Sequence, residues 1–307
     1  MKSARNKTID FSLKEGEKYL NMCVRAENVE KITPNNIVIG DAFESLKKVE
    51  DNSVDLLIVD PPYNLNKYFH GNYFKKSSLE EYKEYTKNWL DAVIKKLKNT
   101  ASVYVCCDWE SALVIGEVLA EKLQLKNRIT WSRDKGRGAK SNWKNSMEDV
   151  FFATVSEEYT FNLEAVKVRK KVLAPYKEKG VPKDWEETKF GKYRNTCPSN
   201  FWNDISVPYW SMAENTAHPT QKPEKLIAKL MLASSNENDL VLDIFAGCGT
   251  TGVVAKKLNR KYICIEQNPL YCAWAEKRLE MAETDKSIQG YKDGIFYERN
   301  SDYTTKR

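Results

Sequence analysis

The feature that most constrains the fold of this chain is a regular alternation of short apolar runs with stretches of helical periodicity. Seven runs of five to seven residues are rich in branched and aromatic side chains and are bounded by polar, Gly or Pro positions, which is typical of buried strands. Strands that alternate with helices indicate βαβ units, so an α/β fold with a mostly parallel seven-stranded sheet is expected. The expected strands are 36–41, 53–59, 101–106, 127–131, 149–155, 240–245 and 261–266.

Helix signals lie between these runs. Ser78 followed by Glu81 forms a capping box, and Pro223 fits the first turn of another helix. A further helix is expected over 13–29. The alternation stops near residue 156 and resumes near 215, which indicates an irregular insert. The chain therefore divides into the ranges 1–35, 36–155, 156–214, 215–283 and 284–307.

The first motif with chemical content is Asp60-Pro61-Pro62-Tyr63, which ends the second expected strand. A turn that merely stops a strand accounts for the prolines, because proline cannot continue a central strand. It does not account for Asp60 and Tyr63 at the carboxyl edge of a sheet, where ligand crevices lie. Asp60 and a proline carbonyl suit an exocyclic amine, since they can accept both its hydrogens and direct its lone pair at an electrophile. Tyr63 suits the face of an extruded base.

The second motif runs from Asp243 through Gly247 and Gly249 to Gly252, between a strand and a helix. Glycines there permit a tight turn and the close approach of a ligand. Glu266 ends the next strand, 23 residues after Asp243, where a carboxylate can accept bonds from both ribose hydroxyls. A turn that is glycine-rich for packing alone is the simpler alternative, but the combined spacing favours a nucleoside cofactor. The form of the turn is similar to that of S-adenosylmethionine sites rather than dinucleotide sites.

The two motifs together resemble the DNA amino-methyltransferase family. The Asp60 motif precedes the glycine turn by about 180 residues, an order that resembles the β group, a circular permutation of the common Rossmann-like methyltransferase sheet. Ile39-Gly40-Asp41 and His218-Pro219-Thr220-Gln221-Lys222-Pro223 match as well. The resemblance implies an N-terminal extension (1–35), a catalytic half (36–155), a target-recognition region (156–214), a cofactor-binding half (215–283) and a C-terminal tail (284–307).

The resemblance also implies roles for particular residues. Asp60, Pro61, Pro62 and Tyr63 would form the catalytic site for the base amine. Glu266 would bind the cofactor ribose, Asp41 would lie near its adenine, and Thr220 and Lys222 would approach its methionine carboxylate. The remaining residues of the implied cofactor site belong to the glycine turn: Asp243, Phe245, Ala246, Gly247, Gly249 and Thr250.

The implied activity is transfer of a methyl group from S-adenosyl-L-methionine to adenine N6 in a short DNA sequence, by direct displacement on a flipped base. Cytosine N4 methylation, RNA methylation and a non-catalytic DNA-recognition subunit stay open, and a hydride-transferring oxidoreductase is a distant alternative. Cytosine C5 methylation is disfavoured, because it usually uses a Pro-Cys nucleophile and this chain has Cys197-Pro198.

Charge is concentrated in one window. The chain carries 49 Lys and Arg against 43 Asp and Glu, a net charge of +6, and residues 126–147 alone hold seven basic side chains against one acidic one. Such a run is usually a solvated surface, but beside a base-modifying site it favours phosphate binding. The predicted DNA-binding residues are Arg133, Lys135, Arg137, Lys140 and Lys144.

Composition narrows the remaining possibilities. The sequence has no run of 18 apolar residues, so no membrane span is expected, and the polar N-terminus lacks the features of a secretory signal. Seven cysteines without a CxxC pair, and only two histidines, argue against a metal site and for reduced core thiols. We expect a cytoplasmic bacterial protein whose partners are DNA and a cognate restriction endonuclease, with a second copy of the chain as a candidate partner.

Overall fold

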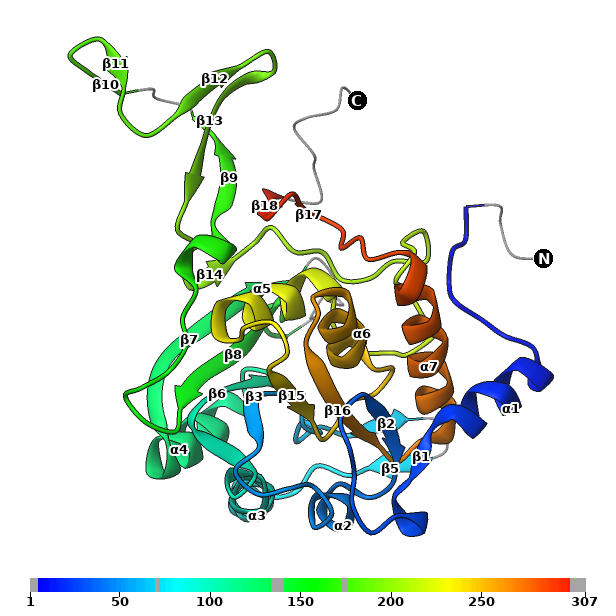
Figure 1. Ribbon diagram of the computed structural model, residues 1–307. Helices are drawn as coiled ribbons and strands as arrows, with labels where there is room; N and C mark the ends of the chain where they lie inside the picture. Colours follow the sequence, from blue (N-terminus) through cyan, green and yellow to red (C-terminus); the bar gives the residue numbers. More distant parts are fainter. Residues whose placement is uncertain (1–4, 70–71, 134–140, 173–175, 299–307) are drawn as a thin grey trace.

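The computed structural model describes residues 5–69, 72–133, 141–172 and 176–298. Within these residues the centre of the molecule is a nine-stranded sheet (Figure 1). All neighbouring pairs are parallel except the two made by β8. In spatial order the strands are β1 (Val24–Arg25), β2 (Asn36–Ile39), β16 (Lys261–Glu266), β15 (Leu240–Asp243), β3 (Val54–Val59), β6 (Leu97–Cys107), β8 (Met147–Thr154), β7 (Gln124–Ser132) and β14 (Phe201–Trp202).

The seven expected strands are all present in this sheet, and β1 and β14 extend its two edges. Each edge strand has two residues, too few for a periodic pattern to predict. Strands β3 and β15 are parallel neighbours, and Leu57 of β3 pairs with Leu242 of β15. The strand that carries the Asp60 motif therefore lies beside the strand that leads into the glycine turn.

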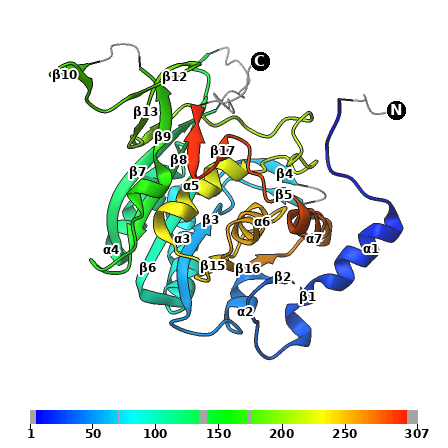
Figure 2. The ribbon, with the colours of Figure 1, turned by 45° about the horizontal axis from the view of Figure 1, so that its top comes forward.

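Helices cover both faces of the sheet (Figure 2). On one face, Leu57 and Val59 pack with α2 (Ala42–Leu46), α3 (Leu79–Ile94) and α4 (Ala112–Lys122). On the other face, Leu56 and Ile58 pack with α5 (Glu224–Ser234), α6 (Thr250–Lys257) and α7 (Pro269–Thr284). Successive strand residues point to opposite faces, so an apolar run without alternation buries both of them.

The two helix starts predicted from capping signals are both present, and one of them is shifted by one residue. The Ser78 hydroxyl accepts from Glu81 N at 3.2 Å and Glu81 accepts from Ser78 N at 2.8 Å, whereas Pro223 lies at the N-cap of α5 rather than in its first turn. The helix expected over 13–29 is wrong beyond Met22. There α1 (Leu13–Met22) ends and Val24 joins the sheet beside Val38, which satisfies its backbone better than an isolated helical turn.

The insert builds a second sheet that projects from the first (Figure 1). The expected tail contributes to it, because β18 runs parallel to β9 with Phe296 opposite Val168, and Phe296 is fully buried. Its strands in spatial order are β12 (Glu186–Thr188), β13 (Gly191–Thr196), β9 (Val168–Lys171), β18 (Ile295–Tyr297) and β17 (Tyr291–Lys292). Two hairpins, β4 (Lys67–Phe69) with β5 (Asn72–Phe74) and β10 (Lys177–Glu178) with β11 (Val181–Pro182), and two short 3₁₀ helices, η1 (Ala26–Asn28) and η2 (Leu163–Val166), complete the described elements.

The seven cysteines are all free thiols, and only Cys197 is exposed. Among the described residues, no group of three or more His, Cys, Asp and Glu side chains is arranged to hold a metal ion. No helix in the same part of the chain combines the length and the apolar character needed to cross a bilayer.

Candidate functional site

The Asp60 motif lies at the carboxyl end of β3, in the middle of the main sheet. The Tyr63 hydroxyl donates to Asp60 Oδ1 at 2.7 Å, and the Tyr82 hydroxyl of α3 donates to the Pro62 carbonyl at 3.1 Å. Burial, and then the Asp60 charge, hold the pKa of Tyr63 well above its usual value, so its hydroxyl stays a donor. The motif is therefore a fixed carboxylate beside an aromatic ring.

The glycine turn connects β15 to α6, next to the Asp60 motif. Gly247 and Gly249 have φ of +52° and +72°, a region that favours glycine. Asp243 holds the turn, because its carboxylate accepts from Phe245 N at 3.0 Å and from the Thr251 hydroxyl at 2.6 Å. Burial raises the pKa of Asp243 to about 7. The carboxyl thus serves the backbone of the turn.

A second pair of carboxylates lies at the ends of β2 and β16. Glu266 accepts from Gly247 N at 2.9 Å and from Asn268 N at 2.8 Å, which ties the end of β16 to the glycine turn. Burial raises the pKa of Glu266. Asp41 caps α2 by accepting from Phe43 N at 2.9 Å. The Gly40 amide donates to the Glu266 carbonyl at 3.1 Å, so the two strand ends are held together.

A cavity of about 640 Å³ opens at these strand ends. It joins both motifs, because its walls include Asp60, Pro61, Pro62 and Tyr63 on one side and the glycine turn on the other. Of the predicted cofactor residues, five line it: Asp41, Thr220, Phe245, Gly247 and Glu266. Four more, Lys222, Asp243, Ala246 and Thr250, line an adjoining cavity of about 40 Å³ that also reaches Asp60.

Gly249 lines neither cavity. A Cβ at this position would lie 2.5 Å from the Ala275 Cβ of α7, so the glycine permits close packing of the turn on that helix. Thr250 is buried, and its hydroxyl donates to the Lys222 carbonyl at 3.2 Å. The structure thus gives both residues clear packing and hydrogen-bonding roles, and their contact with a cofactor stays a prediction.

Lys222 reaches from the cofactor half to the catalytic carboxylate. Its ammonium is paired with Asp60 Oδ2, lies 3.2 Å from the Tyr63 hydroxyl, and is 3.4 Å from Glu148 Oε2 on β8. Burial alone would lower the pKa of Lys222, but Asp60 and Glu148 outweigh it and raise the pKa, so the side chain stays cationic. The predicted contact with a methionine carboxylate would require this ammonium to move.

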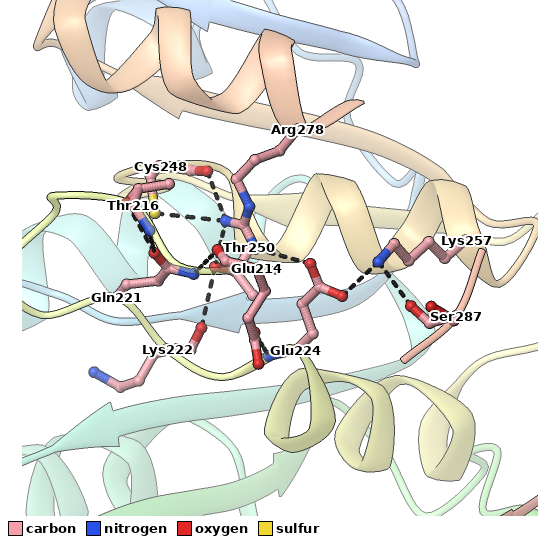
Figure 3. A network of polar contacts seen from close by, with 10 residues as sticks. All are labelled: Glu214, Thr216, Gln221, Lys222, Glu224, Cys248, Thr250, Lys257, Arg278 and Ser287. Atoms are coloured by element: carbon pink, nitrogen blue, oxygen red, sulfur yellow. Dashed lines mark hydrogen bonds and ion pairs between the residues drawn. The ribbon is translucent and has the colours of Figure 1, made fainter. Parts of the chain in front are cut away.

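A buried polar network links the glycine turn to α5, α6 and α7 (Figure 3). Arg278 of α7 donates to the Cys248 carbonyl and to the Thr250 hydroxyl, both at 2.9 Å, and to Glu224 Oε1 at 3.0 Å. Lys257 of α6 lies 2.6 Å from the other Glu224 oxygen. A buried guanidinium is costly unless paired, and here it joins α5, α6, α7 and the turn.

The basic window is less of a free positive patch than its sequence indicates. Arg128 of β7 pairs with Asp149 at 2.6 Å, Lys126 pairs with Glu157 at the same distance, and Arg133 pairs with Glu148. Lys144 is exposed, beside Trp143 with 93% exposure. Lys135, Arg137 and Lys140 lie outside the described residues, and DNA binding by all five predicted residues stays a prediction.

Sequence reasoning missed several residues of the site. Glu148, Tyr85 and Tyr271 come from β8, α3 and α7 without a local motif, so no signal could have found them. His218 received no role, yet it lines the large cavity, its ring packs edge-on against Tyr271 at 4.3 Å, and its Nδ1 accepts from Thr220 N at 3.3 Å. The matching segment from His218 to Pro223 was the sequence signal that could have pointed to this residue.

The residues around the large cavity fit S-adenosylmethionine. A Cβ on Gly247 would lie 3.0 Å from His218 Nε2, so the absence of a side chain at Gly247 lets His218 pack closely against the turn. Glu266 offers a strand-end carboxylate suited to ribose hydroxyls, and Phe43, Tyr85 and Phe245 supply apolar walls. A mostly parallel sheet with this site at its carboxyl edge defines the class of protein: an S-adenosylmethionine-dependent methyltransferase.

Comparison with known proteins identifies the family. Residues 54–277 match the family described as DNA methylase, which acts at N6 or N4 positions. The chain is 33% identical to the type II methyltransferase M.HpaI of Haemophilus parainfluenzae over 80% of its own length and 74% of that protein. It is 37% identical to the DNA adenine methyltransferase YhdJ of Escherichia coli K12, over 80% of this chain and 83% of YhdJ. The chain belongs to this DNA methylase family.

Solved structures agree with this fold. The cytosine-N4-specific PvuII DNA methyltransferase matches with a TM-score of 0.60 at 20% identity, over 88% of this chain and 97% of the other. The M1.HpyAVI complex with S-adenosylmethionine matches with a TM-score of 0.54 at 24% identity, over 79% and 98%. At these identities the comparison supports the fold alone, and the fold is shared by an enzyme that methylates cytosine.

Proposed function

We propose that the chain transfers the methyl group of S-adenosylmethionine to N6 of adenine within a short sequence of duplex DNA. The observation that carries this proposal is the position of Asp60 and Tyr63, which open onto the same cavity as Glu266 and the glycine turn. One cavity of about 640 Å³ thus offers an amine-binding carboxylate and a nucleoside-binding carboxylate to two ligands at once.

Each residue of the site has a task that follows from its contacts. The Asp60 carboxylate and the Pro61 carbonyl accept the amine hydrogens, which orients the nitrogen lone pair. Tyr63 packs on the flipped base, and its bond to Asp60 fixes the carboxylate. Glu266 and the glycine turn hold the cofactor, which supplies an electrophilic methyl group when bound. The negative charge of Asp60, next to the amine, stabilises the positive charge that develops on the nitrogen.

Adenine is favoured over cytosine by relatives and by one residue. YhdJ is named a DNA adenine methyltransferase. Asp at the first position of the Asp-Pro-Pro-Tyr motif resembles the adenine-specific members, whereas cytosine-specific members more often have Ser. The similarity to the PvuII enzyme keeps cytosine N4 as the alternative. A non-catalytic recognition subunit is disfavoured by the intact arrangement around Asp60.

DNA contact is assigned to the basic loop and the insert. The predicted residues Lys135, Arg137, Lys140 and Lys144 would bind phosphates. Arg133, the fifth predicted residue, is paired with Glu148 and is assigned to that carboxylate instead. The projecting sheet of 156–214 would read bases, and Arg169 and Arg194 on it are suited to guanine edges. Arg194 is held 3.1 Å from Asp184, and Arg169 is paired with Glu186, so reading a base with either would exchange an ion pair for a base contact.

The biological setting completes the proposal. M.HpaI and M1.MboII of Moraxella bovis are named type II methyltransferases. We therefore place this chain in a bacterial restriction–modification system, in the cytoplasm, with a cognate endonuclease that acts on the same sequence. A homodimer is a candidate assembly, because β-group enzymes often form dimers.

The test is to express the chain in a host without DNA methylation and to sequence modified bases in its DNA. Digestion to nucleosides gives the modified base, and sequencing gives its position and motif. N6-methyladenine at one short motif is expected. N4-methylcytosine would support the alternative, and unmodified DNA would refute methylation of DNA by this chain.

The catalytic assignment is tested by Asp60→Asn, which keeps the shape of the side chain next to the buried Lys222. The amide cannot accept a hydrogen bond with both of its polar atoms, so the methylation rate is expected to fall by about 10²-fold or more. Cofactor affinity, measured by calorimetry, is expected to change little. Asp51→Asn removes the same charge at the protein surface and serves as the control. An unchanged rate for Asp60→Asn would refute the role of Asp60.

A further inference from the structure

Both oxygens of the Asp60 carboxylate are engaged. Oδ1 accepts from the Tyr63 hydroxyl at 2.7 Å, and Oδ2 is paired with the Lys222 ammonium. A target amine needs an acceptor on this carboxylate. The Lys222 side chain is only 8% exposed and cannot simply leave for solvent. Each carboxylate oxygen can accept more than one hydrogen bond, so an amine on Oδ2 would share this oxygen with the ammonium.

Glu148 offers the ammonium a second partner. Its Oε1 is paired with Arg133, which fixes the carboxylate, and its Oε2 faces Lys222 Nζ at 3.4 Å. Among the described residues Oε2 is buried and makes no hydrogen bond. A buried carboxylate oxygen without a donor is unfavourable. The separation of 3.4 Å is about half an ångström longer than a charge-assisted hydrogen bond.

The charges also permit the exchange. Two cations, Lys222 and Arg133, face two carboxylates, Asp60 and Glu148, in one cluster. If Lys222 moves from Asp60 to Glu148, the ammonium keeps a carboxylate partner, which a buried ion requires, and Asp60 keeps the Tyr63 hydroxyl and gains the amine. A cavity of about 230 Å³, lined by Arg133, Glu148 and Lys222, gives the side chains room on that side.

The exchange would assist the reaction itself. The amine nitrogen gains positive charge as it attacks, and an ammonium bonded to the same carboxylate opposes that charge. We infer that Glu148, held by Arg133, is a positioning residue for methyl transfer: it takes the Lys222 ammonium when the target amine binds Asp60. This inference rests on the proposed function, because it assumes that Asp60 binds an exocyclic amine.

A double-mutant cycle with Glu148→Gln and Lys222→Gln tests the inference. Three quantities are measured: the single-turnover methylation rate on unmethylated duplex DNA that contains the recognition motif, the cofactor dissociation constant and the melting temperature. Glu148→Gln alone is expected to slow methyl transfer by about tenfold or more, because Lys222 loses its alternative partner. Cofactor affinity is expected to stay within about twofold.

The Lys222→Gln background gives the decisive comparison. Without the ammonium, Glu148 has no partner to receive, so Glu148→Gln is expected to change the rate by less than about twofold there, or to restore part of it. An equal loss in both backgrounds, or a wild-type rate for folded Glu148→Gln, would overturn the inference. If Glu148→Gln does not fold, Glu148→Asp supplies the same cycle, since the shorter side chain cannot reach Lys222.

Controls separate this inference from the proposed function. Glu117→Gln removes an exposed carboxylate that pairs with Lys83, and it is expected to leave the rate unchanged. Wild-type enzyme that methylates cytosine N4 would refute the adenine assignment, while the cycle would still test Glu148, because Asp60 would bind either amine. Dependence on Glu148 only in the presence of Lys222 would then support the inference with either base.

Discussion

At the scale of single residues, the site holds several carboxyl groups in partly or fully buried positions and gives each a different partner. Asp60 faces a tyrosine and a lysine, Glu266 accepts two backbone amides, and Asp243 accepts an amide and a hydroxyl. The same functional group therefore has three roles that depend on its neighbours: Asp60 is assigned to the amine, Glu266 to the ribose, and Asp243 stabilises the turn. Sequence patterns identified all three residues, whereas their partners required the structure.

The Asp243 carboxyl predicts a pH dependence of stability. Its folded pKa is raised to about 7 from 3.8, so the unfolded chain loses this proton first as pH rises. The contribution of the protonated Asp243 carboxyl to the free energy of unfolding is complete below about pH 4 and is lost as pH rises to about 7. Asp243→Asn does not ionise, so between pH 5 and 8 its free energy of unfolding should rise relative to wild type by about 1 to 4 kcal/mol.

Urea denaturation at several pH values measures this difference. Thr251→Val removes the 2.6 Å hydrogen bond but keeps the titrating carboxyl, so it should retain the pH dependence of the wild type. Parallel stability profiles for Asp243→Asn and wild type would contradict the assignment of the raised pKa.

At the scale of elements, the turn between β15 and α6 depends on glycine for two different reasons. Gly247 lines the cavity close to His218, whereas Gly249 lets α6 begin against α7. The sequence motif marks both positions alike, because a pattern of glycines does not say what lies opposite each one. The helix expected over 13–29 ended early for a related reason: a neighbouring strand, distant in sequence, offered Val24 better backbone partners.

Gly249→Ala is expected to destabilise the protein by about 2 to 4 kcal/mol, because it adds crowding to an unfavourable φ of +72°. The new Cβ would lie 2.5 Å from Ala275 Cβ. Gly294→Ala is the matched control, since its φ is +77° and nothing lies within 4 Å of its Cβ. It should cost only about 1 to 2 kcal/mol. Equal losses in denaturation experiments would exclude crowding at Gly249.

At the scale of the whole molecule, local charge and net charge differ. The surplus of basic over acidic residues in 126–147 equals the net charge of +6 of the chain. However, Lys126, Arg128 and Arg133 are each paired with a carboxylate, of Glu157, Asp149 and Glu148 respectively. What remains for DNA on the described part of this window is Lys144, beside the exposed Trp143.

Lys144→Ala is therefore expected to weaken binding to any duplex and to reduce the slope of log affinity against log salt by about 0.9 in magnitude. Fluorescence anisotropy with specific and unrelated duplexes measures both effects. Lys31→Ala, which removes an exposed lysine paired with Glu50, should leave the slope unchanged. A loss confined to the specific duplex would contradict phosphate binding by Lys144.

The sequence by itself determined the α/β class, the permuted order and the two motifs, because buried strands, capping residues and glycine turns are local patterns. It also placed Asp60, Tyr63 and Glu266 at strand ends. Only the tertiary structure decided that Lys222 contacts Asp60, that Glu148 faces Lys222, and that Phe296 completes the sheet of the insert. Those contacts join residues far apart in the chain, and their energies depend on burial and on paired charges that arise only after the sheet has formed.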